Sequence, residues 1–296
     1  MDKEEEITRL LEDSISKSIV GEKNIGLIFS AGVDSTLVGV LACKFTSVSA
    51  YNVGISGSVD REYAKKVEKD LGFNVNFVEV DEKEIEKTLP TVLKAIGEPN
   101  PLKVAVGLPF YFASKAASKD GFSVMLCGQG PDELFGGYAR YLTDFENKGF
   151  NGVAQSMQDD LTNLYESQLQ YDEKVCKLNN ITLKFPFLNK DLVEYVSKIP
   201  IQEKIKILGA GPSYECVDEV KELKVIRKFI LREAAKSVGV PDPILNRPKK
   251  AAQYGSGTSK VIEKLARKRG CKKQALDEGR TDYVRYYIES IWNEIK

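Results

Sequence analysis

The sequence predicts an α/β fold, in which a parallel sheet carries helices on both faces and is followed by a mostly helical C-terminal region. Short, continuously apolar runs alternate with longer amphipathic segments through the first half of the 296-residue chain. Such runs are typical of strands buried on both faces, and strands that alternate with helices imply parallel pairing through right-handed crossovers. After about residue 146 the apolar runs fade and helical periodicity dominates.

The first half of the chain is predicted to contain an N-terminal helix and four strands. The helix covers residues 4–18, and its apolar face consists of Ile7, Leu10, Leu11, Ile15 and Ile19. The strands are expected at residues 25–30, 48–55, 75–80 and 124–127. The helices between and after them are expected at residues 34–45, 61–71, 83–96, 109–119 and 132–145. We therefore expect an N-terminal helix over residues 1–20 and an α/β core over residues 21–146.

The remaining residues, 147–296, are predicted to form a helical region packed on this core. Its helices are expected at residues 151–180, 189–198, 219–239, 258–270 and 281–294. Proline-containing connectors separate them, at Phe185-Pro-Phe187, Ile199-Pro200, Gly211-Pro212 and Pro241-Asp-Pro243.

The composition excludes several classes of chemistry. The chain has no histidine, which removes Ser-His-Asp triads, Cys-His dyads and HExxH zinc sites. Its five cysteines form no CxxC pair, so we expect reduced thiols rather than disulfides or a zinc site. With 43 basic and 43 acidic residues, no overall charge attracts nucleic acid or anionic lipid. No apolar run is long enough to span a membrane and the N-terminus is acidic, so we expect a cytoplasmic protein without a membrane partner.

A polar, glycine-containing loop follows the first expected strand. It has the sequence Ser30-Ala-Gly-Val-Asp-Ser-Thr36 and leads directly into a helix. Ligands of open parallel sheets bind at the carboxyl ends of strands, where a helix N-terminus presents free N–H groups and its positive dipole end. Together with Gly32 and the hydroxyl groups, these features predict a polyphosphate cradle. Asp34 has the wrong charge for phosphate, so we expect it to hold Mg²⁺; the alternative is that Asp34 and Ser35 merely cap the helix.

A second glycine-rich turn follows the strand expected at 124–127. It has the sequence Gly128-Gln-Gly-Pro-Asp-Glu-Leu-Phe-Gly-Gly-Tyr138. A well-capped helix would explain its proline and its two acidic residues. It would not explain the two glycines before Tyr138, which cost about 1 kcal/mol each inside a helix, so another group is expected to approach the backbone there. Asp132 would complete a Mg²⁺ site with Asp34.

These two strings resemble the motifs of a known enzyme family. Residues 30–35 resemble the PP-loop, Ser-Gly-Gly-x-Asp-Ser, of ATP pyrophosphatases, with Ala31 in place of the first glycine. Residues 128–138 resemble the Ser-Gly-x-Gly-x-Asp-Glu-x-Phe-Gly-Gly-Tyr signature of the synthetase domain of asparagine synthetase and of the related β-lactam synthetases. The resemblance implies a Rossmann-like sheet of the adenine nucleotide alpha-hydrolase type. It also implies cleavage of ATP between its α- and β-phosphates, with Mg²⁺ on Asp34 and Asp132.

Further blocks extend the resemblance over residues 21–258. They are Glu98-Pro99 with residues 107–114, Phe185-Pro-Phe-Leu188, residues 225–233 and Arg247-Pro-Lys-Lys250. Lys228 and Lys249 match family lysines, and preorganised cations stabilise the charge that develops on leaving pyrophosphate; the alternative for Lys228 is a solvated helix face. The expected ATP and pyrophosphate site comprises Phe29, Ser30, Ala31, Gly32, Val33, Asp34, Ser35, Val53, Cys127, Gly128 and Gln129.

Gln129 is a departure from the family pattern, because asparagine synthetase has a glutamate there that is a candidate catalytic base. A glutamine amide cannot accept a proton at neutral pH, so another group must. The candidates are Glu98, Glu133, a tyrosine such as Tyr138, or excess of the attacking amine, and Glu98 is the one to test. About twenty residues precede the first strand and position 2 is Asp2 rather than a nucleophilic cysteine, so we expect no hydrolysis of glutamine. The nitrogen is then ammonia or an amine, taken from solution or from a separate glutaminase subunit.

The favoured function is that of an AMP-forming ligase, which activates a small-molecule carboxylate for attack by ammonia or an amine and makes asparagine poorly or not at all. One alternative is a tRNA-modifying PP-loop enzyme, although the missing CxxC argues against thiolation. Its candidate contacts are Lys260, Lys264, Arg267, Lys268, Arg269, Lys272, Lys273 and Arg280. A solvated helix face would explain the same charges. The other alternative is a non-catalytic nucleotide-binding module, against which Asp34, Asp132 and Lys249 argue. The sequence specifies neither the carboxylate nor the oligomeric state.

Overall fold

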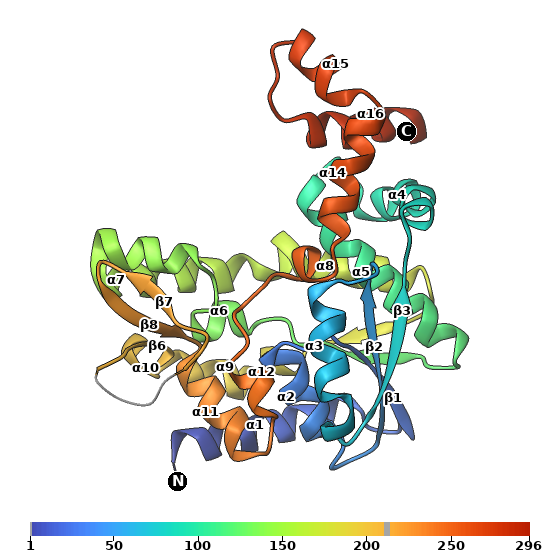
Figure 1. The fold of residues 1–296 in the computed structure, drawn as a ribbon. Helices are drawn as coiled ribbons and strands as arrows, with labels where there is room; N and C mark the ends of the chain where they lie inside the picture. The colour runs from blue at the N-terminus through green and yellow to red at the C-terminus, as the bar shows by residue number, and fades with distance from the viewer. Residues whose placement is uncertain (1, 210–213) are drawn as a thin grey trace.

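Five parallel strands form the central sheet of the structure, a computed structural model that describes residues 2–209 and 214–296. The strands are β1 (Asn24–Ile28), β2 (Ser47–Gly54), β3 (Asn74–Glu79), β4 (Val124–Leu126) and β5 (Thr182–Lys184), in the spatial order β3-β2-β1-β4-β5 (Figure 1). In the centre, Ile25 of β1 lies beside Val48 of β2, and Gly26 lies beside Met125 of β4. The predicted parallel sheet is confirmed. Its fifth strand was not expected, because Thr182–Lys184 contains two polar residues and lacks the apolar run that marks the other strands.

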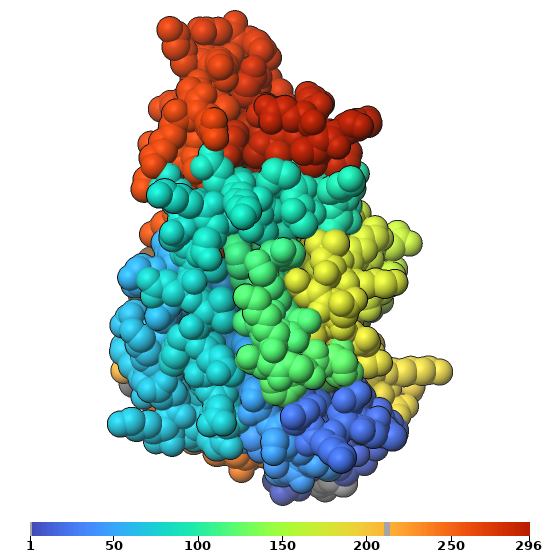
Figure 2. Space-filling model, turned by 90° about the vertical axis from the view of Figure 1, so that its right-hand side faces the viewer, coloured from blue at the N-terminus to red at the C-terminus, as the bar shows by residue number. Residues whose placement is uncertain are grey.

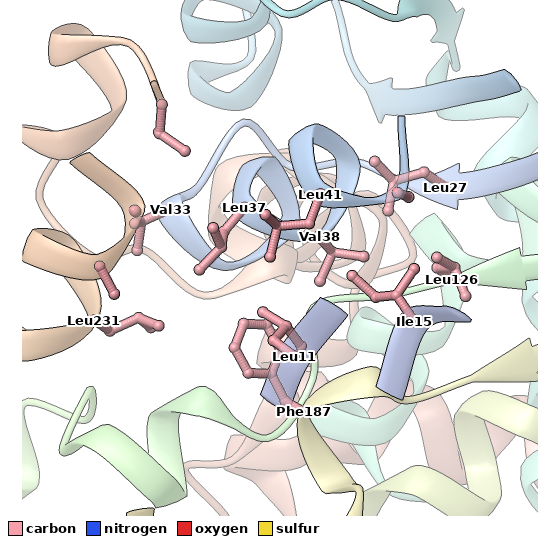
Figure 3. Close-up of a cluster of buried hydrophobic side chains, with 14 of the residues drawn as sticks. Leu11, Ile15, Leu27, Val33, Leu37, Val38, Leu41, Leu126, Phe187 and Leu231 are labelled. Carbon is pink, nitrogen blue, oxygen red and sulfur yellow. The ribbon is translucent and has the colours of Figure 1, made fainter. Parts of the chain in front are cut away.

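Helices cover both faces of this sheet, as the sequence predicts. The helices of the first half are α1 (Lys3–Ser18), α2 (Val33–Ala42), α3 (Val59–Val67, followed by a 3-10 turn over Glu68–Asp70), α4 (Glu82–Ile96) and α5 (Pro101–Lys119). On one face, Leu27 of β1 and Leu126 of β4 share a core with Leu11 of α1 and Leu37 of α2 (Figure 3). On the other face, Tyr51 of β2 belongs to a second core with α4 and α5. Alternate side chains of the strands therefore enter separate cores.

The helix expected over residues 132–145 is wrong as a single element. The helices after β4 are α6 (Pro131–Phe135), α7 (Arg140–Leu164) and α8 (Gln170–Lys177), with a π-helical turn over Tyr165–Leu169 before the last. Gly136 ends α6 in the left-handed region, at a φ of 72°. A Cβ at Gly137 would overlap both the carboxylate of Asp132 and the side chain of Lys228. The two glycines thus end the helix and make room for side chains beside the backbone, as expected from their cost inside a helix.

A small antiparallel sheet in the C-terminal half was also not expected. It consists of β6 (Ile205–Ile207), β7 (Asp218–Val220) and β8 (Leu223–Arg227), in the order β6-β8-β7. The helix expected over residues 219–239 is therefore wrong in its first half, and only α11 (Phe229–Ser237) occupies the second. Val220, Leu223, Ile226 and Ile230 recur at intervals of three or four, which fits a helix as well as two short strands. The connector expected at Gly211-Pro212 lies outside the described residues.

The remaining elements are helical, and three of them correspond to the helices expected at residues 189–198, 258–270 and 281–294. They are a 3-10 turn over Pro186–Leu188, α9 (Lys190–Ser197), α10 (Ile201–Lys204), α12 (Asp242–Leu245), α13 (Ala252–Gly255), α14 (Thr258–Lys268), α15 (Cys271–Asp277) and α16 (Tyr283–Ile295). Of the last three, α14 and α16 pack against α4, and α15 packs on these two helices farther from the sheet (Figures 1 and 2). Leu265 of α14 and Ile288 of α16 extend the second core. Among the helices of the described residues, none combines the length and the hydropathy needed to cross a membrane.

Candidate functional site

The two glycine-rich loops meet at the carboxyl ends of β1 and β4. The first loop leads from β1 into α2, and Gly32 is the residue before that helix. The second follows β4, and a Cβ at Gly128 would lie 2.7 Å from the backbone nitrogen of Ser35 and 3.1 Å from Cβ of Asp34. Position 128 must therefore be glycine for the loops to touch. The sheet order brings the loops together, because it makes β1 and β4 neighbours.

Four charged side chains converge where these loops meet, and we call them the Asp–Lys cluster. Lys228 Nζ lies 2.7 Å from Asp34 Oδ2 and 2.7 Å from Asp132 Oδ1. Lys249 Nζ lies 2.6 Å from Asp132 Oδ2 and 3.9 Å from Asp34 Oδ2. The structure thus joins the two residues predicted to hold metal with the two lysines predicted to stabilise the leaving group.

Lys228 is the most deeply buried member of the cluster. Only 1% of its side chain is exposed, so the alternative of a solvated helix face is wrong. Its backbone, at φ 56° and ψ 34°, is in the left-handed region directly before α11. This conformation costs a residue other than glycine roughly 1–2 kcal/mol, and it persists only where the surroundings fix it. Two hydrogen bonds from Nζ to Asp34, of 2.9 and 2.7 Å, do so here.

Burial and charge act in opposite directions on the ionisation of this cluster. Burial disfavours the charged form of Asp132, but Lys228 and Lys249 outweigh it and hold the pKa of this carboxyl well below its usual range. Burial likewise disfavours the charged form of Lys249, but Asp132 and Asp34 outweigh it and raise the pKa of the ammonium group. Asp132 and Lys249 therefore both remain charged at neutral pH.

The two aspartates fit the Mg²⁺ ion that the sequence implies. Asp132 Oδ1 is buried and accepts no aligned hydrogen bond, although Lys228 Nζ lies 2.7 Å away. Mg²⁺ prefers oxygen ligands and is commonly bound by one or two carboxylates together with the phosphates of a substrate. Within residues 2–209 and 214–296, no three acidic or cysteine side chains surround one point. Phosphate oxygens and water would therefore have to complete the ligand sphere.

A small pocket opens beside the Asp–Lys cluster. The first loop contributes Ser30, Gly32, Val33 and Asp34 to its lining. Its cationic residues are Lys228, Arg232, Arg247, Lys249 and Lys250. Five cations, one carboxylate and the N-terminus of α2 make this a site for an anion with several charges, such as polyphosphate. The sequence prediction assigned no role to Arg232, Arg247 or Lys250, although all three lie in blocks that resemble the family.

The conformation of the first loop explains the glycine that the family motif has at position 31. Ala31 is fully buried and has a φ of 54°, in the left-handed region that favours glycine. Ser35 Oγ lies 3.3 Å from the nitrogen of Ser30 and 3.3 Å from the carbonyl oxygen of Gly32. These local contacts close the loop around Ala31.

Gln129 makes a hydrogen bond to a buried carboxyl group that no motif had indicated. Its Nε2 donates to Asp172 Oδ2 of α8 at 2.9 Å. Asp172 is 2% exposed. Burial raises its pKa to about 7, although the hydrogen bond from Gln129 opposes the shift. A carboxyl group with this pKa gains and loses a proton readily near neutral pH. Asp172 could not be found from the sequence, because it lies in an amphipathic helix without a motif.

Glu133 is a second buried carboxyl group with a raised pKa. It is 4% exposed and follows Asp132 in α6. Burial and the neighbouring charge of Asp132 raise the pKa of Glu133 to about 7. Tyr138 Oη donates a hydrogen bond of 2.5 Å to Glu133 Oε1. This contact links the helix of the second loop to the start of α7.

Glu98, our candidate base, lies between α4 and α5 and forms an ion pair with Lys103. Lys103 Nζ also lies 3.7 Å from the centroid of the Tyr171 ring. Tyr171 directly precedes Asp172 in α8, so these contacts lead from Glu98 toward Gln129 rather than toward the Asp–Lys cluster. The role of Glu98 as a base stays a prediction.

The other predicted nucleotide-binding residues lie at adjacent strand ends. The nitrogen of Phe29 donates to the carbonyl oxygen of Tyr51 at 3.1 Å, and Asn52 Nδ2 donates to the carbonyl oxygen of Phe29 at 2.9 Å. Val53 and Cys127 are buried at the carboxyl ends of β2 and β4. The position of the adenosine across these strands stays a prediction.

Most of the basic side chains near the C-terminus are engaged with acidic neighbours. Lys264 and Lys268 both contact Glu82 of α4, and Arg269 contacts Glu86 of the same helix. Arg280 contacts Asp282 and Glu289, and Arg267 contacts Glu263. The pairs with Glu82 and Glu86 join the α14 end of this region to α4, and the other pairs are local. This arrangement favours a solvated helix face over contact with RNA as the explanation of the charges.

Comparison with known proteins identifies relatives over nearly the whole chain. A family model described as asparagine synthase matches residues 6–154 and 146–287. A Methanocaldococcus jannaschii protein named asparagine synthetase 1 (glutamine-hydrolyzing) is 38% identical over 289 residues, which is 93% of this chain and 53% of that protein. Asparagine synthetase B (glutamine-hydrolyzing) of Escherichia coli is 23% identical over 273 residues, covering 86% of this chain and 45% of that protein. The chain spans about half the length of these relatives.

Among solved structures, the NH3-dependent NAD synthetase of Campylobacter jejuni is similar to this chain, with 17% sequence identity and a TM-score of 0.34. The match covers 69% of this chain and 95% of that one.

Proposed function

The chain belongs to the asparagine synthase family, and from that premise we propose that it is an ATP-dependent carbon–nitrogen ligase. In this proposal it adenylates a small-molecule carboxylate, releases pyrophosphate and transfers the acyl group to ammonia or an amine. The observation that carries the proposal is the Asp–Lys cluster at the ends of β1 and β4, beside a pocket lined by five cations. Nucleotide binding alone would not require two lysines, one of them fully buried, that are both held against the same carboxylates.

In the first half-reaction, an oxygen of the substrate carboxylate attacks the α-phosphorus of ATP, and the bond to the β-phosphate breaks. The bridging oxygen and its electron pair leave with pyrophosphate. In this proposal Lys228 and Lys249 stabilise this charge, and the ion pairs that already hold both lysines support that role. Asp34 and Asp132 would hold Mg²⁺, which neutralises phosphate charge when it is bound.

In the second half-reaction, the amine attacks the acyl carbon, loses a proton, and AMP leaves. Gln129 can orient a substrate but cannot take that proton. We propose Glu98 as the base, and Asp172 is a second candidate because its pKa of about 7 suits proton exchange and it contacts Gln129. Loss of amide formation with intact release of pyrophosphate, in Glu98→Gln or in Asp172→Asn, would decide between them.

The nitrogen donor of this chain is proposed to be ammonia or an amine rather than glutamine. A glutaminase needs an activated nucleophile, and a thiolate is the reactive form of cysteine. Burial raises the pKa of all five thiols, namely Cys43, Cys127, Cys176, Cys216 and Cys271. Hydrolysis of glutamine by the pure protein would contradict this part of the proposal.

The deciding experiment measures pyrophosphate release from ATP and Mg²⁺ across a panel of carboxylic acids, with and without ammonium. We expect at least one acid to give AMP and pyrophosphate in equal amounts. No acid-dependent release would contradict the proposal, and release that requires tRNA would support the alternative of a tRNA-modifying enzyme.

The substrate is proposed to differ from aspartate, because Gln129 replaces the glutamate of asparagine synthetase. A general base typically raises the rate of a step that requires loss of a proton, such as the attack of ammonia on the acyl group, by about 10²–10⁴-fold. We therefore expect little aspartate-dependent formation of AMP with ammonium in the wild type, and more in Gln129→Glu. Efficient formation of asparagine by the wild type would show that this substitution does not decide the substrate.

A further inference from the structure

A buried ion pair beside the phosphate pocket joins Asp60 of α3 to Arg247 of the segment after α12. Asp60 is 3% exposed and Arg247 is 5% exposed. Arg247 Nη2 contacts Asp60 Oδ1, and Nη1 donates to the carbonyl oxygen of Ser30 at 2.5 Å. The guanidinium carbon also lies 4.6 Å from the centroid of the Tyr63 ring. One guanidinium therefore connects α3, the first glycine loop and the segment that carries Lys249.

The same segment is held from its other sides. Arg232 of α11 donates to the carbonyl oxygen of Leu245 at 2.5 Å and to that of Arg247 at 3.2 Å. A Cβ at Gly255 would overlap the carboxylate of Asp60, so the backbone of α13 closes directly over this group. Residues 245–255 are thus fixed at both ends, with Lys249 between the fixed points.

The contacts of Arg247 are those of a structural tie. Its charge is matched by a buried carboxylate, and both of its terminal nitrogens are engaged with protein oxygens. The planar fork of an arginine suits this double contact, and a lysine could not reproduce it. Lys249 is also paired with a carboxylate, 2.6 Å from Asp132, but 25% of its side chain is exposed, against 5% for Arg247. The segment therefore presents one buried cation and, two residues later, one cation that is partly exposed at the pocket.

We propose that Asp60 is a positioning residue: by holding Arg247 against the carbonyl of Ser30, it sets Lys249 at the leaving pyrophosphate, and Arg247 acts as a tie rather than as a phosphate ligand. This inference rests on the proposed function, because it assigns Lys249 its role in the release of pyrophosphate. It adds a residue of α3, outside every motif, to the machinery of that step.

The test compares Asp60→Asn, Arg247→Lys and the double variant in the full chain. We expect each single variant to lower kcat for pyrophosphate release by at least about tenfold, because small displacements of a catalytic group cost this much or more. KM for ATP and the inhibition constant of pyrophosphate should stay within about threefold, since no phosphate ligand is removed. The double variant should be no worse than the worse single one, because both break one contact.

Asp160→Asn is the matched control. Asp160 Oδ2 contacts Arg140 Nη2 at 2.5 Å, and the Arg140 guanidinium also lies 5.1 Å from the Tyr141 ring, outside the lining of the phosphate pocket. This variant should keep kcat. If Arg247→Lys weakens inhibition by pyrophosphate more than tenfold while Asp60→Asn changes nothing, Arg247 is a phosphate ligand and the proposal is overturned.

A readout that does not need turnover separates this inference from the proposed function. Asp60→Asn should speed amide hydrogen exchange over residues 245–255, and exchange at the wild-type rate would overturn the tie even if no substrate were found. Failure of the proposed function would instead appear in the wild type, as no release of pyrophosphate with any acid. If Asp60→Asn does not fold, Tyr63→Leu removes only the ring beside the guanidinium, and it must show the same faster exchange.

Discussion

Two buried carboxyl groups flank the second glycine loop, and their surroundings treat them in opposite ways. Asp132 faces Lys228 and Lys249, which hold its pKa well below the usual range despite burial. Asp172 faces the uncharged amides of Gln129 and Gln168, and burial raises its pKa to about 7. Burial alone favours the neutral acid, so the difference lies in whether fixed cations are present.

This contrast matches the two halves of the proposed reaction. Breaking ATP develops negative charge, which fixed cations stabilise without reorganisation. Forming the amide requires a proton to move, for which a group with a pKa near neutrality is best suited. The Asp–Lys cluster suits the first requirement and the Gln129–Asp172 pair suits the second. Gln129 and Asp132 belong to the same glycine-rich turn, so in this proposal a short stretch of chain contributes to both half-reactions.

The largest effect is expected from removing a carboxylate of the Asp–Lys cluster. Asp34→Asn and Asp132→Asn should each abolish Mg²⁺-dependent release of pyrophosphate. The rate should fall by at least about 10²-fold, because removing other preorganised electrostatic groups has a cost of this size. The fold should remain, because asparagine keeps the shape of the side chain. Pyrophosphate assays and thermal melts with and without Mg²⁺ check this, and full turnover in either variant would remove the metal from the mechanism.

Lys249→Met should also lower the rate of pyrophosphate release strongly, but by less than the two aspartate variants do. Without this cation, kcat should fall by about 10²–10³-fold while the chain still binds ATP. Lys250→Met is the comparison, because Lys250 also lines the pocket but makes no contact with the Asp–Lys cluster that the structure records. We expect it to cost no more than about tenfold. Equal losses in both variants would mean that the pocket needs total charge and not a placed lysine.

The ionisation of Asp172 is tested by the pH dependence of the free energy of unfolding. Asp172 has a folded pKa of about 7, above its usual value of 3.8. Between these values the folded state keeps a proton that the unfolded state has lost, so the free energy of unfolding falls as the pH rises from about 4 to 7. Asp132 has the opposite sign, because its folded pKa is lowered; its contribution is present above the unfolded pKa and is lost in acid.

Asp172→Asn should remove the first of these dependences. The free energy of unfolding of the variant minus that of the wild type should rise between pH 5 and pH 8, by on the order of a few kcal/mol. Urea unfolding at the two pH values measures this, with Asp160→Asn as a control that keeps Asp172. A wild-type pH dependence in Asp172→Asn would show that Asp172 does not titrate in this range.

The smallest effect concerns backbone strain in the first glycine loop, which carries Asp34. Ala31→Gly should relieve the left-handed conformation at a φ of 54° and raise stability, by less than about 1 kcal/mol because a buried methyl group is lost. Ala42→Gly is the control, since Ala42 is equally buried but helical in α2, where glycine costs about 0.5–1 kcal/mol. Opposite signs in thermal melts are expected, and equal destabilisation would mean that Ala31 carries no strain.

The sequence by itself determined the features that depend on neighbours along the chain. The apolar runs predict β1 to β4, and the residues after β1 and β4 predict two loops that lead into helices. The cost of glycine in a helix indicated a close approach at Gly137, which the structure confirms with Asp132 and Lys228. These features arise from local backbone conformation and from periodic burial, and both are written in short stretches of sequence.

Only the tertiary structure decided which side chains meet. Lys228 contacts Asp34 across 194 positions, and Arg247 contacts Asp60 across 187. The same holds for Asp172, which lies 43 positions from Gln129, and for the strands β5 to β8, whose short runs gain their conformation from pairing. The physical reason is that strand order and helix packing set these distances, and a carboxyl group then takes its charge state from whichever neighbours the fold supplies.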